Sequence, residues 1–286
     1  MRSLAFFLLL MTSATQAFTL NNNFSASFKK SRVKVFVAGD STCTQFALTQ
    51  ADLQSYVKPA VERFWNKVPT SRLRLKSSGF SSPISGVDIT QARLCSPTDS
   101  ACISDANTKG QTVLPGVQNI IISCNQLADN FQDTSVLAVT VPNKFSGKKI
   151  KGAVILIYDN SSNPFKNLSR SDRIGVIAHE IGHAIGLGHS EEEKALMYYK
   201  VVDQRETLGE DDMDGVTYLY PVKLDGCGIM DSLVASTVAF KGKGKDDDTQ
   251  GGGGSSFWQM GIGFLFFLVL TEILKLLKRY QARPAL

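Results

Sequence analysis

The chain has 286 residues, of which 43% are hydrophobic and 20% are charged, with a formal net charge of +5. Enough apolar side chains are present to build a folded core, so the composition excludes a chain that is disordered throughout. The positive charge is modest, and no long basic tract with interleaved aromatic residues occurs, so nothing indicates a nucleic-acid partner.

Residues 1–17 are typical of a signal peptide. Arg2 gives a positive start, residues 4–11 form an unbroken apolar run, and Thr15 to Ala17 offers small residues for cleavage after Ala17. A buried N-terminal strand is the alternative. We therefore expect the protein to be exported, with an extracellular or cell-surface location.

The next segments predict a strand, a helix and a second strand. Residues 18–31 form a polar lead-in that is too short for a folded pro-domain. Residues 32–38 alternate polar and apolar side chains, as a half-buried strand does. Residues 49–68 carry apolar side chains at helical spacing up to Pro69, and residues 72–76 alternate again.

The middle of the chain predicts loops and further strands. Residues 77–88 are rich in Ser, Gly and Pro and residues 95–109 are polar, so both are expected to be loops. The apolar run at 119–123 suits a central strand.

Two more strands are expected before the strongest motif. Residues 136–141 predict one of them, followed by a turn at 142–149. Residues 151–158 predict the other, and because residues 153–157 are apolar without alternation this strand should be buried on both faces.

The five cysteines leave the disulfide pattern open. They are Cys43, Cys95, Cys102, Cys124 and Cys227. Cys95 and Cys102 could close a short loop, free buried cysteines are the alternative, and an odd number leaves one thiol over. Without a Cys-x-x-Cys spacing, the sequence does not indicate a thiolate metal site.

The strongest functional signal runs from His179 to Ser190. His179 and His183 are four residues apart, so on a helix both project from one face and can bind one metal ion. A catalytic zinc needs three protein ligands and one open position, and His189 is the candidate for the third ligand. Gly186 permits the turn that would bring His189 back to the metal.

A metal centre explains this pattern better than chance does. A short His-Glu-x-x-His pattern also occurs by accident on surface helices. Here the three histidines of the chain all fall within the extended pattern, with a glycine between the second and the third. We therefore predict one catalytic Zn²⁺ held by His179, His183 and His189, with Glu180 as the general base that activates water.

The pattern His-Glu-x-x-His-x-x-Gly-x-x-His resembles the signature of the metzincin metalloproteases. Ser190 after the third histidine resembles the matrixin branch, in a microbial or divergent form. Residues 195–198 resemble the family's methionine turn, which contains Met197, and residues 208–220 resemble its closing helix.

The resemblance implies an α+β metzincin (zincin-like) fold. Its twisted, mostly parallel sheet would be accompanied by an active-site helix and a C-terminal helix, and the domain would span residues 32–230. The implied activity is that of a zinc endopeptidase acting on extracellular proteins or peptides. Residues 138–141 would form the sheet edge beside the cleft, where an extended substrate adds by main-chain hydrogen bonds; an ordinary edge strand is the alternative.

Several features depart from animal matrixins. No cysteine precedes Cys43, so the propeptide cysteine that keeps those enzymes latent is missing, and with every histidine assigned a second zinc is not expected. A calcium ion is compatible with the chain, but no motif supports one. Tyr199 stands where matrixins carry proline, and it could stabilise the oxyanion or form a wall of the substrate pocket.

Structural roles are expected for the remaining motif residues. Met197 would form an apolar floor beneath the imidazoles, or simply pack in the core. Thr207 with Glu210 fits a capping box. We expect Asp211 and Asp212 to anchor the closing helix to the methionine turn rather than to act in catalysis.

The C-terminal region predicts a tether. Residues 231–256 form a linker rich in Gly, Asp and Lys, residues 257–277 form an apolar helix, and residues 278–286 form a basic cytoplasmic end. The helix could be a single membrane anchor with the catalytic domain outside, a sorting signal that is cut at the glycines, or a buried core helix.

A non-catalytic function is compatible with the same motif. A surface binding or adhesion module could keep the fold and the metal without catalytic turnover. Loss of peptide cleavage on replacement of Glu180 would separate the enzyme from this alternative.

Overall fold

The computed structural model describes residues 18–21, 25–84, 86–200 and 205–222. The predicted signal peptide, the C-terminal linker, the apolar helix at 257–277, residues 278–286 and Cys227 lie outside these residues. Among the described residues, no helix has the length and apolar character needed to cross a bilayer.

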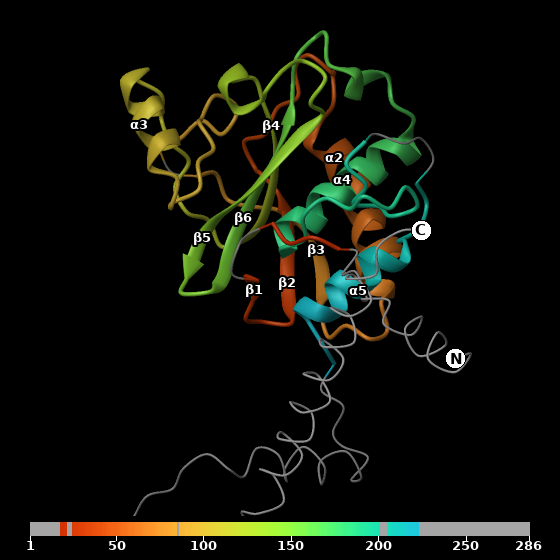
Figure 1. Ribbon diagram of the computed structural model, residues 1–286. Coiled ribbons are helices and arrows are strands. Elements are labelled where there is room, and N and C mark those ends of the chain that lie inside the picture. The colour runs from red at the N-terminus through yellow and green to blue at the C-terminus, as the bar shows by residue number, and fades with distance from the viewer. Residues whose placement is uncertain (1–17, 22–24, 85, 201–204, 223–286) are drawn as a thin grey trace, which may run out of the picture. The chain divides into compact units, whose positions relative to one another are not determined.

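The domain is built on one six-stranded, mostly parallel sheet (Figure 1). Its strands are β1 Ser27–Phe28, β2 Arg32–Val37, β3 Arg74–Phe80, β4 Asn119–Asn125, β5 Ala138–Ser146 and β6 Lys149–Tyr158. The order is β1-β6-β4-β2-β3, and β5 pairs with β6 as the one antiparallel strand of this sheet.

Four α-helices accompany the described sheet. They are α2 Gln50–Pro59, α3 Ser100–Thr108, α4 Arg170–Ile185 and α5 Glu210–Leu219. Helix α2 continues through a π-helical turn at Ala60–Phe64 and a 3₁₀ turn at Trp65–Lys67, and further 3₁₀ turns lie at Ala128–Asn130 and Pro164–Asn167. This arrangement confirms the predicted α+β class with a mostly parallel sheet.

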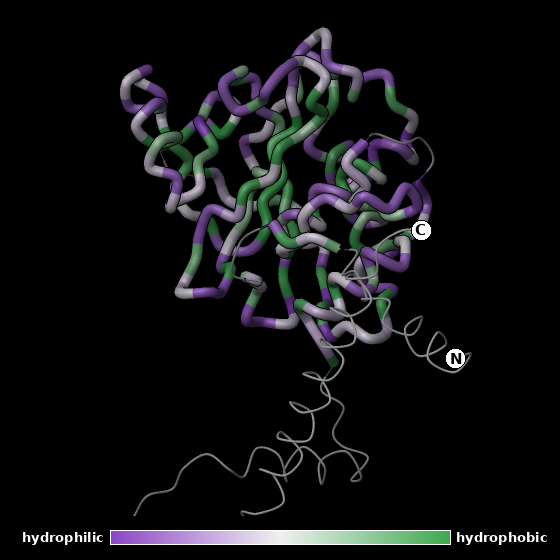
Figure 2. The backbone as a smooth tube through the Cα atoms, in the orientation of Figure 1, coloured by the Kyte–Doolittle hydropathy of each residue, from purple (hydrophilic) through white to green (hydrophobic). Residues whose placement is uncertain are grey.

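Apolar packing covers both faces of the sheet. The larger core joins the sheet to α2 and α4 through fully buried side chains such as Leu53, Ile155 and Ile181. A smaller core on the opposite face includes Ile121 and Val154. Strands β4 and β6 are therefore buried on both sides, and Figure 2 shows them as apolar stretches through the middle of the domain.

Residues 95–109 differ from the predicted loop because they contain helix α3. The Asp99 side chain caps this helix by accepting a hydrogen bond from the Cys102 amide at 3.0 Å, and a disulfide joins Cys95 to Cys102. Ala106 is the one buried residue of the helix. Helix α3 therefore has no apolar face whose periodicity could predict it. The Asp99 cap and the disulfide stabilise it instead.

The turn predicted at 142–149 is also shorter than expected. Strand β5 continues to Ser146, with register shifts around Lys144 after Pro142, and the chain reverses near Gly147, which has a φ of 54°. A strand at the edge of a sheet tolerates proline because one side of its backbone makes no ladder hydrogen bonds.

The lead-in at 18–31 is part of the folded domain. Strand β1 pairs with β6, with Ser27 beside Lys149, and Ala26 and Phe28 are buried in the larger core. The packed domain thus begins before residue 32.

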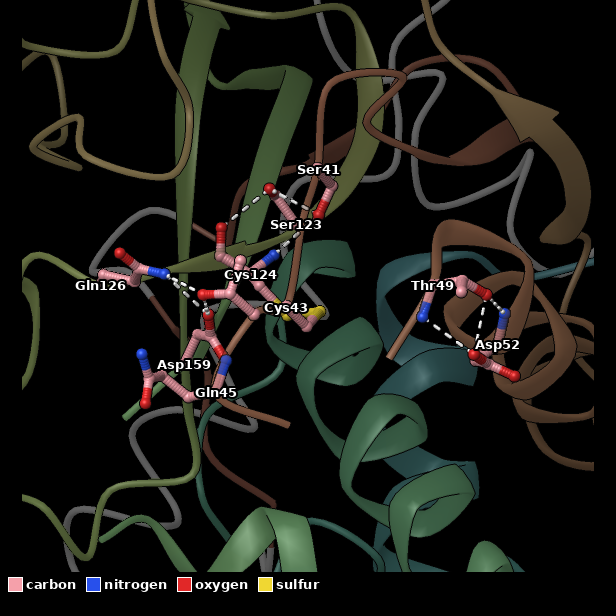
Figure 3. Close-up of a disulfide and its surroundings, with 10 residues drawn as sticks. Ser41, Cys43, Gln45, Thr49, Asp52, Ser123, Cys124, Gln126 and Asp159 are labelled. Atoms are coloured by element: carbon pink, nitrogen blue, oxygen red, sulfur yellow. Dashed lines mark hydrogen bonds between the residues drawn. A yellow bond between two sulfur atoms is a disulfide. The ribbon is translucent and has the colours of Figure 1, made fainter. Parts of the chain in front are cut away.

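A second disulfide joins Cys43 to Cys124 across 81 residues of sequence, which links the loop after β2 to the end of β4 (Figure 3). Beside it, the Ser41 hydroxyl accepts hydrogen bonds from the Cys124 amide at 3.1 Å and the Ser123 hydroxyl at 3.0 Å. The buried Asp159 carboxylate accepts from the Gln45 amide at 3.0 Å. Polar groups around this covalent link are therefore paired.

Candidate metal and catalytic site

Helix α4 places the first two histidines. The Ser169 side chain caps its first turn by accepting from the Asp172 amide, and Gly186 ends it in the left-handed conformation with a φ of 115°. Ile177 and Ile181 are fully buried and fix one face of the helix against the sheet. Glycine adopts this φ without steric cost, so the helix stops where the chain must turn toward His189.

The structure brings the three imidazoles together. One nitrogen from each of His179, His183 and His189 lies within 4.8 Å of the other two, and the Nε2 atoms of His183 and His189 are 3.2 Å apart. The described residues thus converge three nitrogen ligands on one point, as the spacing predicted.

Hydrogen bonds fix which nitrogen of two imidazoles can bind a metal. His179 Nδ1 lies 2.8 Å from the Leu196 carbonyl, and His183 Nδ1 lies 2.9 Å from the Leu187 carbonyl. A carbonyl only accepts, so each Nδ1 carries the proton and each Nε2 keeps its lone pair. This donor set suits Zn²⁺, which prefers neutral imidazole nitrogens.

Burial favours the neutral form of these histidines. It lowers the pKa of His179 to about 3, with the neighbouring His183 acting in the same direction. Burial also lowers the pKa of His183 and of His189. All three imidazoles can therefore act as ligands at neutral pH.

The turn that carries His189 is held by the N-terminal lead-in. The Gly188 amide donates to the Thr19 carbonyl at 2.8 Å, the Asn21 amide donates to the Gly186 carbonyl at 2.9 Å, and the Thr19 hydroxyl donates to the His189 carbonyl. The sequence carries no local pattern for this support, because it joins segments about 170 residues apart.

Met197 lies directly beneath helix α4. A Cβ atom added to Gly182 would lie 2.3 Å from the Met197 sulfur and 2.7 Å from the Trp65 ring, so only glycine fits there. Met197 is 2% exposed. The glycine between the first two histidines was not singled out from the sequence, although it admits both the methionine and the tryptophan to the underside of the site.

Asp212 anchors the methionine turn to helix α5. Its carboxylate accepts hydrogen bonds from the amides of Leu196 at 2.5 Å, Met197 at 2.9 Å and Gly209 at 2.7 Å. The structural role predicted for Asp212 is confirmed. The predicted capping box of Thr207 and Glu210 is wrong, because the helix begins at Glu210 and Gly209 holds the N-cap position.

Glu180 lies beside the histidines and is 7% exposed. Its Oε2 accepts a hydrogen bond of 2.5 Å from the Thr140 hydroxyl, which projects from edge strand β5. Burial raises the pKa of Glu180 to about 7, while the Thr140 hydrogen bond acts in the opposite direction. No pattern in the sequence predicts the role of Thr140, because its contact with Glu180 forms only when β5 packs beside α4.

The site opens into a cleft of about 1510 Å³. Ala138, Val139, Thr140 and Val141 line one side along β5, and the three histidines and Glu180 form its floor. Tyr199 also lines the cleft but is 53% exposed. The edge strand and the candidate metal site therefore face the same space.

The fold and this geometry define a metzincin-type catalytic domain: a mostly parallel sheet with one antiparallel edge strand, three converging imidazoles, an adjacent glutamate and a methionine turn beneath them. The matrixin family model matches residues 126–221, which include all of these site residues. The chain therefore carries a matrixin-like metzincin catalytic domain.

Curated relatives point to the same family. Metalloendoproteinase 5-MMP of Arabidopsis thaliana is 41% identical over 59 residues, which is 20% of this chain and 16% of that protein. Metalloendoproteinase 1 of Glycine max is 41% identical over 56 residues, or 19% of this chain and 18% of that protein. Human matrix metalloproteinase-27 is 38% identical over 66 residues, or 22% and 13% of the two chains. The matches thus span less than a fifth of the length of each relative.

Proposed function

We propose that the protein is a zinc-dependent endopeptidase. The observation that carries the proposal is the convergence of three neutral imidazoles on one point, with Glu180 beside them and an open cleft above them. Matrixin-type relatives with metalloendoproteinase names support the same reading.

His179, His183 and His189 would hold the metal through one nitrogen each. When bound, zinc supplies a Lewis acid that acidifies water and polarises the scissile carbonyl. Glu180 takes the proton of the attacking water and returns it to the leaving amine, so the peptide bond is hydrolysed without a covalent enzyme intermediate.

Substrates are proteins or peptides bound in an extended conformation along β5. This edge strand lines the cleft, and its free backbone edge can pair with a substrate segment. Tyr199 is placed on the cleft wall, where its phenol could donate to the developing oxyanion; its exposure also suits contact with substrate side chains.

The protein acts outside the cytoplasm. Two disulfides among the described residues support an oxidising compartment. Residues 1–17 would direct export, and residues 257–277 would serve as a membrane anchor or as a sorting signal that is removed.

The decisive experiment replaces Glu180 with Gln in the full chain and measures cleavage of casein and of a peptide library. We expect activity to fall by roughly a thousandfold or more while bound zinc is unchanged, because the proton acceptor is lost and the ligands remain. Glu62→Gln, at an exposed position in the turn after α2, is the matched control.

Two results would contradict the proposal. One is full activity of Glu180→Gln or of chelator-treated protein. The other is a wild-type chain that binds zinc and cleaves no member of a diverse library, which would favour a binding module on the same fold.

A further inference from the structure

Positive charge is strongly segregated along this chain. Residues 25–39, 66–87 and 134–158 contain no Asp or Glu, yet they carry twelve Lys and Arg residues. Their members are Lys29, Lys30, Arg32, Lys34, Lys67, Arg72, Arg74, Lys76, Lys144, Lys148, Lys149 and Lys151. A net charge of +5 could be reached with acidic and basic residues evenly mixed, so it does not by itself explain three segments without Asp or Glu.

The fold gathers these stretches at one end of the sheet. In parallel strands the N-terminal ends meet at the same edge, and β2, β3 and β6 begin at Arg32, Arg74 and Lys149. The β1–β2 turn and the β5–β6 turn lie at this end as well (Figure 1), and Figure 2 shows it as polar. Nine of the twelve cations are exposed. One of them, Lys67, lies in the 3₁₀ turn after α2, and we call the other eight the basic end: Lys29, Lys30, Arg32, Lys34, Arg74, Lys76, Lys148 and Lys149.

Like charges face each other across two of its strands. Arg32 is in register with Arg74, and Lys34 with Lys76. Neighbouring strands are about 4.8 Å apart and alternate residues about 6.6 Å apart, so the backbone positions of these four residues form a compact square. Directly opposed like charges destabilise a sheet, and the ion pairs found in the described part of the chain involve Arg93 and Lys109 but none of these eight.

The simplest explanation of an exposed lysine is that water solvates its charge. Solvation does not explain why cations stand opposite each other on neighbouring strands, in sequence segments that contain no Asp or Glu. A bound polyanion does, because it would offset the repulsion between the rows. The basic end also lies apart from the candidate active site, since none of its eight residues lines the cleft.

The shape of the basic end distinguishes two kinds of polyanion. Four cations lie in strands β2 and β3, whereas Lys29, Lys30 and Lys148 lie in the turns at the rim and Lys149 begins strand β6. A flat bilayer can contact either the cations in β2 and β3 or those at the rim, but not both at once. A flexible linear polyanion can bend and contact both groups. The planar guanidinium of arginine can also donate two hydrogen bonds at once to two oxygens of a carboxylate or of a tetrahedral oxyanion such as sulfate.

We propose that the basic end binds a linear sulfated polysaccharide, at a site separate from the cleft. Such a site would hold the domain on an extracellular matrix or glycan surface while the cleft stays open. The inference stands independently of peptidase activity.

The test uses the full chain and heparin as the probe, with binding measured by calorimetry over a range of salt concentrations. Lys34→Gln combined with Lys76→Gln removes one opposed pair. We expect roughly tenfold weaker binding and a shallower dependence on salt, because fewer counterions are released. Lys58→Gln combined with Lys166→Gln, two exposed lysines outside the basic end, is the control of equal charge change and should bind within about twofold of wild type.

Retained thermal unfolding midpoints show that both double variants are folded. Equal losses in the two variants would overturn the proposal, since the effect would then follow net charge alone. Undiminished binding of fully desulfated heparin would overturn it too. Binding to phosphatidylglycerol vesicles that depends on Lys34 and Lys76, without binding to heparin, would replace the polysaccharide with a membrane.

Discussion

Different interactions stabilise the two halves of the domain. Residues 18–125 supply β1 to β4 and contain both disulfides, whereas residues 126–221, which match the matrixin family, supply the candidate site. In the second half, directional hydrogen bonds dominate around the site: Leu196 orients His179, and Asp212 holds the methionine turn. The ladder hydrogen bonds and apolar packing that hold a sheet leave its side chains free to choose among rotamers, whereas a metal-binding imidazole needs a hydrogen bond that fixes its orientation.

The largest expected effect tests the first half. Replacing Cys43 and Cys124 with Ser should lower the free energy of unfolding by about 4 kcal/mol, because the bond closes a loop of 81 residues. The pair Cys95 and Cys102 closes only 7, and its loss should cost about 2 kcal/mol. Urea denaturation measures both.

The zinc affinity of either folded double variant should equal that of wild type. If removal of the Cys43–Cys124 bond lowered the free energy of zinc binding by more than it lowered the free energy of unfolding, the separation between residues 18–125 as scaffold and residues 126–221 as metal site would be wrong.

The second half should be most sensitive at Asp212. Asp212→Ala leaves three amide donors without this acceptor, two of them buried and the third partly buried, and we expect a loss of roughly 3 kcal/mol in stability together with weaker zinc binding. Asp214→Ala, two residues away and exposed, should change neither. Denaturant unfolding and zinc titration supply the two readouts, and unchanged zinc affinity in Asp212→Ala would show that the methionine turn holds its place without this carboxylate.

Acid should lower the free energy of unfolding of the chelator-treated protein, through the three histidines in residues 126–221. The pKa of His179 is about 3 in the folded state and 6.5 when unfolded, so between pH 6.5 and about 3 only the unfolded state gains this proton. Stability should therefore drop by about 1.4 kcal/mol per pH unit for this imidazole. His183 and His189 shift in the same direction and add to the loss.

Glu180 opposes this acid loss. Its pKa is about 7 when folded and 4.5 when unfolded, so the folded state gains the extra proton between these values and is favoured as pH falls. Glu180→Gln should thus make the loss of stability between pH 6.5 and 4.5 steeper by about 1.4 kcal/mol per pH unit. Equal slopes in thermal or urea unfolding would contradict the buried, protonated state of Glu180.

The same contrast explains what the sequence could predict. The order of strands and helices follows from local periodicity, and the fold class is confirmed. His179, His183 and Gly186 lie within one helix and its end, so their spacing alone placed them. Helix α3 was missed because a cap and a disulfide hold it in place of an apolar face.

Contacts between distant segments left no local signal. Cys43 and Cys124 are 81 residues apart, and the pairing of Thr19 with Gly188 joins opposite ends of the domain. Gly182 was hidden for another reason, because its need to be glycine depends on Trp65 and Met197 lying beneath it. The catalytic roles of Glu180 and Tyr199 stay predictions.

The smallest expected effect lies where the site meets the edge strand. Thr140→Val keeps the β-branched shape of the side chain but removes the hydroxyl that donates to Glu180. If Glu180 is the general base of the proposed endopeptidase, losing this single hydrogen bond, worth about 1 kcal/mol, should lower kcat roughly fivefold because the carboxylate is less firmly oriented. KM and zinc content should stay unchanged, since Val still lines the cleft and touches no ligand. Thr140→Ser restores the donor and should recover most of kcat, whereas Thr112→Val, at an exposed site, should have no effect. A Ser variant as slow as the Val variant would mean that side-chain shape matters at this position, and that the hydroxyl does not orient Glu180.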